Sequence, residues 1–282
     1  MTLQAELDRI VTPRLAAPKA TVMTLDIERL PGRAVHEHRG ITMDGPFWDL
    51  SGWKSTLGYR LPPVSVVEWP RTICVAWRFY GAKRTEFASE WGDGPEAMLC
   101  RVWHAYDTAD VIYGHNVNGF DTKHLNTAWR DLGLPPPSPF KIVDTLTEAR
   151  KVFGDESMQL VALTERLGIA TKTDKYDPDV ARAAVAGNKA AQRKIRAYNI
   201  GDVAASEALV DRLRGWIPSH PHNLQGVSTD VPTCNQCWGP NLAENGWKMA
   251  QQMKYPLFRC QDCGGQVQGR RGVRVSDVRP VR

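Results

Sequence analysis

The residues of this chain best suited to metal chemistry are four carboxylates and one phenol, which fall in three short motifs. In chain order they are Asp26 with Glu28, then Asp121, then Tyr198 with Asp202. Magnesium prefers oxygen ligands and keeps several waters, so a few carboxylates from separate elements make its usual protein site. Two such ions about 4 Å apart can hold both the attacking and the leaving oxygen of a phosphodiester. The three motifs therefore predict metal-assisted cleavage of phosphodiester bonds.

The first motif lies in an apolar run, residues 21–28, that is predicted to be a buried strand. Side chains alternate between the two faces of a strand, so Asp26 and Glu28 are expected on the same face. Unpaired carboxylates on a buried strand are costly unless they bind a cation. Taken alone, the pair can also be an acidic strand end that faces water.

The second motif follows a short predicted strand at 111–114 and opens a predicted helix from about 121 to 132. A loop at the carboxyl end of a strand is where α/β proteins place binding groups, which makes Asp121 a candidate metal ligand. Taken alone, Asp121 can equally be a helix cap.

The third motif lies in a predicted helix from 188 to about 216. Tyr198 and Asp202 are four residues apart, so both side chains project from one face of the helix. A tyrosine with its ordinary pKa near 10 is a poor general base at neutral pH, so Tyr198 is better suited to orient a water. The alternative is a core tyrosine beside an incidental aspartate.

The other elements complete an α/β pattern. Further strands are predicted at 72–80, from the turn at 81–84 through about 90, and at 141–143, and a further helix from 95 to about 106. Strands come first and helices later, with one β-α-β-α-β stretch in the middle. That order fits a mixed sheet with an antiparallel hairpin and flanking helices. Residues 33–70 are long for a plain loop and predict a functional insertion next to the Asp26 strand.

The three motifs together resemble the DEDD superfamily of 3′→5′ exonucleases, which have the ribonuclease H-like fold. The resemblance covers residues 21–216 and includes the N-x-x-x-[FY]-D pattern at 116–121. Tyr198, with Ala197 where another branch would carry histidine, is similar to the DEDDy branch. The resemblance implies that Asp26 bridges two ions and that Tyr198 hydrogen-bonds the attacking water. The implied ligands of the two Mg²⁺ or Mn²⁺ ions are Asp26, Glu28, Asp121 and Asp202.

The resemblance also implies substrate-binding residues, for which alternatives remain open. Asn116 and Phe120 are implied to shape the substrate groove. His115, next to Asn116, is a candidate for the same groove or a loop histidine satisfied locally. Lys172 lies where related enzymes carry a lysine that could meet the DNA backbone, or it lies in a solvated loop. Asp144 resembles an acid common in related exonucleases and can equally serve the start of a helix.

Two C-x-x-C pairs, with 22 residues between them, have the layout of a zinc ribbon. The four cysteines are Cys234, Cys237, Cys260 and Cys263. Each turn presents two thiolates to one tetrahedral ion and four ligands leave no open position, so one structural Zn²⁺ is predicted. A segment with little core of its own can gain its stability from such a metal. Cys74 and Cys100 stand singly in apolar stretches and are predicted to be small buried side chains.

Length and composition predict two domains in 282 residues. The resemblance implies that the first is a ribonuclease H-like exonuclease domain at 1–217, with the aromatic insertion at about 33–70, and the cysteine spacing predicts that the second is a Cys₄ zinc ribbon with a basic tail at 219–282. The hydrophobic fraction of 42% and the charged fraction of 24% are those of a soluble globular protein. Residues 1–19 lack the apolar stretch of a signal peptide, and no apolar run approaches the roughly 18 residues of a membrane helix. A cytoplasmic protein is expected, in the host cytoplasm if it is phage-encoded.

Charge points to nucleic acid as the partner. Of the formal net charge of +5, most lies in residues 219–282, which hold eight basic and four acidic residues. Such a basic tail suits phosphate contacts, although a solvated disordered end has the same composition. The ribbon can bind nucleic acid, bind protein or only cap the fold.

These observations lead us to expect a 3′→5′ exonuclease that hydrolyses single-stranded DNA or 3′ ends and releases nucleoside 5′-monophosphates. Its expected setting is DNA replication or repair, with a DNA polymerase or replication protein as a partner. One alternative is a 3′→5′ exoribonuclease with the same catalytic residues. Another is a non-catalytic, nucleic-acid-binding adaptor for a polymerase.

Overall fold

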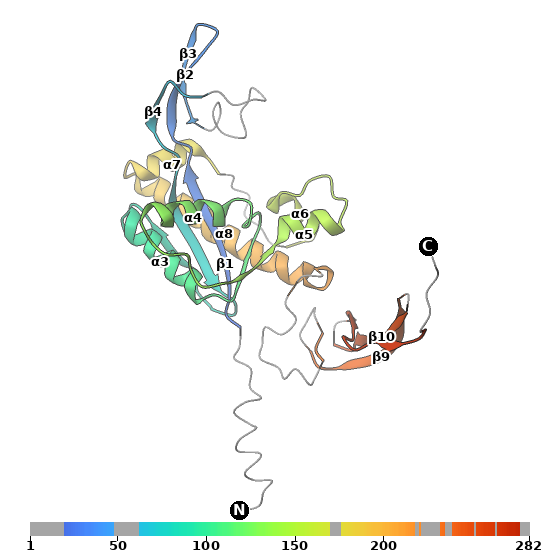
Figure 1. Ribbon diagram of the computed structural model, residues 1–282. Coiled ribbons are helices and arrows are strands. Elements are labelled where there is room, and N and C mark those ends of the chain that lie inside the picture. Colours follow the sequence, from blue (N-terminus) through green and yellow to red (C-terminus); the bar gives the residue numbers. More distant parts are fainter. Residues whose placement is uncertain are drawn as a thin grey trace, which may run out of the picture.

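A five-stranded mixed sheet forms the centre of the molecule, here a computed structural model (Figure 1). The structure describes residues 20–47, 62–169, 176–217, 220, 232–234, 239–250, 252–262 and 264–276. The sheet order is β6-β5-β1-β7-β8, with bounds β1 Val22–Leu30, β5 Arg71–Phe79, β6 Glu86–Ser89, β7 Val111–Gly114 and β8 Lys141–Asp144. The central strand β1 is antiparallel to β5 and parallel to β7, and β7 is parallel to β8. The predicted mixed sheet with an antiparallel hairpin is confirmed.

Helices cover both faces of this sheet (Figure 1). The side chains of β1 are therefore buried on both sides. Met23, Leu25 and Ile27 share a buried apolar cluster with α3 (Pro95–Thr108) and α4 (Asp121–Asp131). The intervening residues of β1 face α8 (Lys189–Leu213), where Thr24 hydrogen-bonds Glu207 and Asp26 hydrogen-bonds Asn199. The predicted alternation of β1 therefore sends its apolar residues to one helical layer and its carboxylates to the other.

The remaining helices pack around α8. They are α5 (Thr145–Val152), α6 (Leu160–Arg166), α7 (Pro178–Val185) and the 3₁₀ turn η1 (Arg214–Trp216). Asn188 caps α8 by accepting from the backbone N–H groups of Ala190 and Ala191, so the predicted helix start at 188 is confirmed. Within the part of the chain that the structure describes, no helix has both the length and the apolar character to cross a membrane.

Residues 33–70 contain a second, three-stranded antiparallel sheet that the sequence patterns did not predict. Its order is β3-β2-β4, with bounds β2 Arg33–His38, β3 Ile41–Gly45 and β4 Ser65–Glu68, and residues 48–61 lie outside the described part. It continues the β1–β5 pair beyond the central sheet (Figure 1). At the junction Gly32 has a φ of 71°, and a Cβ there would lie 2.6 Å from the carbonyl oxygen of Glu68.

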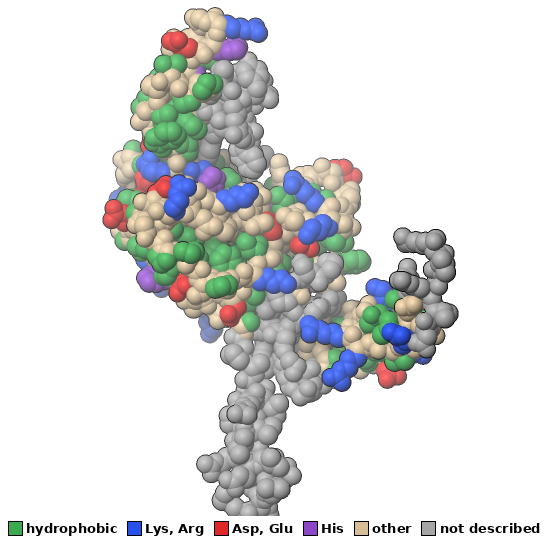
Figure 2. Space-filling model, in the orientation of Figure 1, with side chains coloured by type: hydrophobic (Ala, Val, Ile, Leu, Met, Phe, Trp, Pro, Cys, Tyr) green, Lys and Arg blue, Asp and Glu red, His purple; other side chains and the backbone are tan. Residues whose placement is uncertain are grey.

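This small sheet exposes an apolar surface, on which Val67 and Trp69 are 58% and 67% exposed (Figure 2). Trp69 also contacts Phe47, with ring centroids 5.5 Å apart. The insertion is therefore a folded element with its own exposed surface.

The C-terminal strands form a third sheet. They are β9 (Leu242–Met249), β10 (Met253–Cys260), β11 (Gln266–Gln268) and β12 (Val273–Arg274). β10 pairs with β9 on one side and with β11 and β12 on the other, all antiparallel. Almost every residue of β9 and β10 is exposed or half-buried, and only Cys260 is buried in these two strands. This sheet has very little apolar core.

Candidate metal centre

The candidate site lies beside β1, just beyond the residues at which β7 stops pairing with it. β7 pairs with β1 only at Val22–Thr24, so the following residues of β1 have no strand on that side. The N-terminus of α4 takes this place, and the backbone N–H of Ile27 donates to Oδ1 of Asp121 over 3.0 Å. In open α/β sheets, ligands bind where neighbouring strands diverge at their carboxyl ends. The fold thus places two of the predicted acidic motifs side by side.

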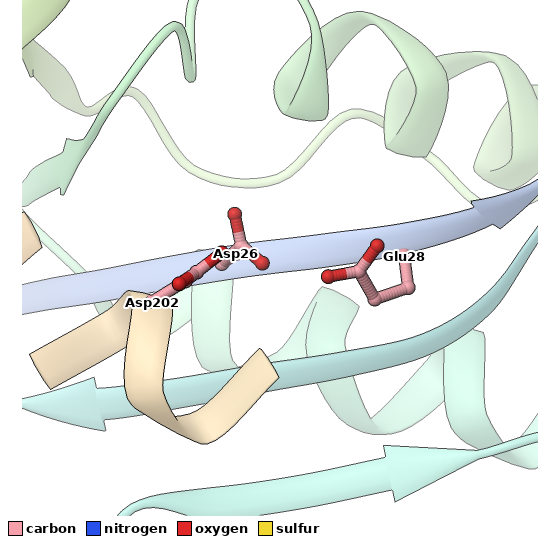
Figure 3. Close-up of side chains that lie close together, drawn as sticks. All are labelled: Asp26, Glu28 and Asp202. Carbon is pink, nitrogen blue, oxygen red and sulfur yellow. The ribbon is translucent and has the colours of Figure 1, made fainter. Parts of the chain in front are cut away.

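Three of the predicted carboxylates converge at this point (Figure 3). Asp26 and Glu28 come from β1 and Asp202 from α8, and one carboxylate oxygen of each lies within 4.8 Å of the other two. Glu28 is 7% exposed, and the other two are half-buried. Oxygen ligands at this spacing are what a hard divalent cation requires. Residues 26 and 202, far apart in the sequence, therefore form one potential metal site.

Asp121 lies beside this trio and is buried, with 3% of its surface exposed. Its negative charge contributes to raising the pKa of both Asp26 and Glu28. Burial raises the pKa of Asp121 itself to about 7, against the opposing effect of the hydrogen bond from Ile27. Asp121 is therefore placed as a flanking carboxylate, with one oxygen already held by the backbone of β1.

The electrostatics of the centre favour a bound cation. Burial raises the pKa of Asp26 well above its ordinary value, and the charges of Glu28, Asp121 and Asp202 raise it further. The pKa of Glu28 is raised well above its usual range for the same two reasons. No positively charged side chain among the described residues contributes to the pKa shifts of Asp26, Glu28 or Asp121. Buried carboxylates that repel each other in this way fit a divalent ion, which would remove the repulsion.

Tyr198 lies at the edge of the centre, one helical turn before Asp202. It is half-buried and hydrogen-bonded to the Asp202 carboxylate. Burial and the negative charges of Asp202 and Glu28 hold the pKa of the Tyr198 phenol well above its ordinary value. The phenol is therefore protonated at neutral pH, so it can donate or accept a hydrogen bond but cannot act as a base.

Asn199 is a residue of the site that the motifs did not reveal. Its side-chain amide nitrogen donates to Oδ2 of Asp26 over 2.7 Å and to the Asp26 carbonyl oxygen over 3.0 Å. Asn199 is fully buried. The amide fixes the rotamer of Asp26, and it lowers the pKa of that carboxyl while burial raises it. Its position directly after Tyr198 was the only signal in the sequence.

An ion pair holds α8 against β1 next to the centre. Arg78 on β5 pairs with Glu207 on α8 over 2.7 Å, and Thr24 on β1 contacts the same carboxylate over 3.5 Å. Thr24 lies opposite Arg78 in the β1–β5 register. Glu207 follows Asp202 by five residues on α8, so this contact helps to fix the position of Asp202 relative to β1.

The loop before Asp121 is held by Asp144. The Asp144 carboxylate accepts from the backbone N–H groups of Asn116 and Asn118, each over 3.0 Å. It also accepts from two N–H groups at the start of α5, for which it is the N-cap. Of the two roles left open for Asp144, the structure supports the helix start. Asp144 therefore positions the loop rather than facing a ligand.

The structure gives His115 a local role and does not bring it to the metal centre. Nδ1 of His115 hydrogen-bonds the Thr145 hydroxyl and Nε2 hydrogen-bonds the Met158 carbonyl oxygen, both over 2.9 Å. Burial lowers the pKa of this imidazole. Both ring nitrogens are used, which favours the alternative of a locally satisfied loop histidine, and a role of His115 in substrate binding stays a prediction.

The other predicted substrate residues differ in what the structure shows. Asn116 has a φ of 65°, and a Cβ at Gly119 would lie 2.5 Å from its Oδ1, so only glycine leaves room for this side chain. Phe120 is half-buried and contacts His124, with ring centroids 4.6 Å apart. Lys172 lies outside the described residues. Roles in substrate binding for Asn116 and Phe120 stay predictions.

Cys234 and Cys260, the first cysteines of the two C-x-x-C pairs, form the same kind of backbone hydrogen bond. The backbone N–H of Cys234 donates to the carbonyl oxygen of Gly239, and that of Cys260 to Gly265, over 2.9 and 2.8 Å. Both cysteines are buried, with at most 1% of their surface exposed. Cys237 and Cys263 lie outside the described residues. Two matching C-x-x-C-x-G turns, each with its first cysteine buried, are compatible with the predicted zinc site.

Comparison with protein-family models and with curated proteins gives no match for this chain. What can be said of its function therefore rests on the geometry of these residues.

Proposed function

We propose that the chain is a metal-dependent 3′→5′ exonuclease that hydrolyses single-stranded DNA. The observation that carries the proposal is the group of Asp26, Glu28 and Asp202 beside Tyr198, in which one carboxylate oxygen of each lies within 4.8 Å of the other two. The order of the five-stranded sheet supports a ribonuclease H-like fold, with the acidic motifs on β1, at the start of α4 and on α8. This is the arrangement that the resemblance to the DEDDy exonucleases implies.

Two Mg²⁺ or Mn²⁺ ions bound here would supply a polarised water and stabilise the negative charge on the leaving oxygen. Asp26, Glu28, Asp202 and Asp121 would hold these ions, with Asp26 as the shared ligand that the resemblance implies. Asn199 fixes the Asp26 carboxylate for this role. Tyr198 remains protonated and orients the attacking water through its hydroxyl.

The reaction needs no covalent intermediate with the protein. The water oxygen forms a bond to phosphorus while the bond from phosphorus to the 3′ oxygen of the preceding nucleotide breaks. The water gives up one proton and the leaving 3′ oxygen takes one up. The products are a nucleoside 5′-monophosphate and a strand shorter by one nucleotide, with a free 3′ hydroxyl.

Replacement of Asp26 by asparagine tests the proposal, because it keeps the shape of the side chain and removes its charge. Changes to groups that merely support metal ligands lower activity by about 10–100-fold, so Asp26→Asn is expected to lose at least about a hundredfold in rate. The measurement is release of nucleotides from a 3′-labelled DNA strand with Mg²⁺ or Mn²⁺. The exposed Asp131, on α4 but paired only with its neighbour Arg130, supplies the matched control Asp131→Asn.

The outcomes separate the alternatives. If Asp26→Asn cuts as fast as the parent, the catalytic assignment is wrong. If neither protein cuts DNA but the parent degrades RNA from its 3′ end, the chain is an exoribonuclease with the same centre. If the parent binds strands but degrades neither, it is a binding module. A parallel measurement with 5′-labelled strands shows whether cleavage starts at the 3′ end.

For the C-terminal segment we propose a zinc ribbon with one structural Zn²⁺ held by Cys234, Cys237, Cys260 and Cys263. The two matching turns support it, as does the lack of other buried residues in β9 and β10. Four thiolates complete a tetrahedral site, so this ion would stabilise the fold and take no part in hydrolysis.

A further inference from the structure

A positively charged groove, separate from the metal centre, lies between the end of β6 and the first turns of α8. It has a volume of about 410 Å³. Its lining includes Phe87 and Trp91 on one side and Lys189, Arg193 and Arg196 of α8 on the other. None of the carboxylates of the metal centre is among its lining residues. It is therefore a separate site on the same domain.

The positive charge of this groove is not neutralised by the protein around it. Asp93, the acidic residue of the lining, is bound to Arg101 over 2.5 Å. Lys189, Arg193 and Arg196 form no ion pair with any residue among the described ranges. They follow one another at four- and three-residue intervals, so their side chains lie along one face of α8. Three adjacent cations without acidic partners attract a polyanion.

Aromatic side chains line the groove next to these cations. Arg196 lies over the ring of Phe87, 5.2 Å from its centroid, and the rings of Phe87 and Trp91 are 6.2 Å apart. Both aromatic residues are half-buried, so their orientation is fixed by the core. Guanidinium groups and aromatic rings side by side are the groups that bind single strands, by contacts to phosphates and by stacking on bases.

The groove and the metal centre share one helix. Arg196 and Tyr198 are two residues apart on α8, which is about 3 Å along the axis and about 200° around it. Ala197, which lies between them, is exposed. The groove and Tyr198 therefore lie on opposite faces of α8, and a strand that occupies both sites would cross the exposed face of the helix at Ala197.

We propose that this groove is a second, non-catalytic contact for the sugar-phosphate backbone of the single strand whose 3′ end enters the metal centre. The inference rests on the proposed function for the identity of the strand, and its test is independent of cleavage. The groove holds nucleotides upstream of the cut and thereby keeps the strand bound between successive cleavages.

The test is binding of a fluorescently labelled dT₂₀ strand in buffer without Mg²⁺ or Mn²⁺, where nothing is cut and the proposed structural Zn²⁺ stays in place. The variant carries Arg193→Gln together with Arg196→Gln. Each phosphate contact to a single strand contributes about 0.7 to the slope of log affinity against log salt concentration. The double variant is therefore expected to bind more weakly and to lose about 1.4 from this slope.

The matched control carries Lys83→Gln together with Arg84→Gln, in the turn between β5 and β6. These two cations are exposed and lie outside the groove, and the charge change is the same. The control is expected to keep the parent's slope. Because Arg196 packs on Phe87, the melting temperature of the double variant is measured first. If it does not fold, Arg193→Gln alone is expected to lose about 0.7 from the slope.

The results that would overturn the inference are distinct from those that bear on catalysis. An unchanged slope in the folded double variant excludes the groove as a strand contact, whatever the outcome for Asp26→Asn. If free dTMP binds the parent as tightly as dT₂₀ and this binding needs Arg193, the groove is a mononucleotide site and the strand proposal is wrong. If the parent does not cut DNA but these substitutions lower its slope by about 1.4, the groove binds a strand and the exonuclease proposal is wrong.

Discussion

The metal centre and the C-terminal cysteine segment are built in opposite ways. At the centre, Asp26 lies between Leu25 and Ile27, which are 1% and 4% exposed, in a strand packed by helices on both faces. In the described part of the C-terminal segment, the buried side chains of the third sheet and its flanking turns are Cys234 and Cys260. The first site is imposed by an apolar core, whereas in the second the buried residues are two of the proposed zinc ligands.

This difference predicts opposite responses to metal removal. A core that forces carboxylates together is strained by their repulsion, so it can be stabilised by removing charge as well as by adding a cation. In the proposed zinc ribbon, a sheet with very little apolar core has little else to hold it, so most of its folding free energy would be the binding free energy of the ion. Catalytic and structural metals should therefore be distinguishable by stability measurements alone.

The largest effect is expected from Cys260→Ser. Structural Zn²⁺ sites contribute about 10–16 kcal/mol of binding energy, more than a small sheet can replace. We expect about one zinc per chain in the parent, none in the variant, and rapid proteolysis of the segment after residue 232 while the domain before it stays intact. Metal analysis and limited proteolysis measure both.

Cys100→Ser, a half-buried cysteine on α3, is the control. A zinc-free but protease-resistant parent would contradict the comparison.

A smaller effect is expected from Asn199→Ala at the metal centre. The variant removes the two hydrogen bonds that fix Asp26, so the rate should fall by about 10–100-fold, as for other residues that orient metal ligands. The free energy of unfolding should fall by about 1–3 kcal/mol.

A matched control for Asn199→Ala is Thr164→Ala, which removes a fully buried hydroxyl bonded to Leu160 and Val161 on α6. It should lower stability without changing the rate. If both variants lose activity in proportion to their stability, Asn199 has only a structural role.

The smallest effect is a pH dependence of stability in EDTA. The pKa of Asp121 is raised to about 7 by burial, so the folded protein holds this proton more tightly than the unfolded chain does. Its contribution to stability is complete below about pH 4 and is lost as the pH rises to about 7. Urea unfolding should therefore show the free energy of unfolding of the parent falling by about 1 kcal/mol or more relative to that of Asp121→Asn over that range.

Saturating Mg²⁺ should reverse the trend, because the ion binds the deprotonated carboxylate. A pH-independent difference would contradict the assignment.

Much of the central fold was predictable because its signals are local. The apolar runs that predicted strands at 21–28, 72–80, 111–114 and 141–143 correspond to β1, β5, β7 and β8. Strand alternation was enough to put Asp26 and Glu28 on one face, and helical spacing was enough for Tyr198 and Asp202. Their convergence followed from the order of the elements in the sheet.

What sequence reasoning missed depends on partners distant in the chain. Strand β2 has the sequence RAVHEH, with too little alternation to predict a strand, and it pairs both with the adjacent β3 and with β4 about 30 residues later. Asn199 was missed for a similar reason, since its hydrogen bonds reach Asp26, and the two roles of His115 stayed open because its partners, Thr145 and Met158, lie elsewhere in the chain. A side chain's partners across the fold are not visible in its neighbours along the chain.

The contribution of α8 to the metal centre has a consequence for how the protein is made. Asp26 and Asp202 are separated by most of the domain, and β1 is synthesised long before the helix that brings Asp202 and Tyr198 to it. A ribosome-bound chain shorter than this helix has the sheet strands but an incomplete set of ligands. Contacts so distant in sequence form late in folding. The proposed metal centre is thus incomplete in the growing chain until α8 has left the ribosome.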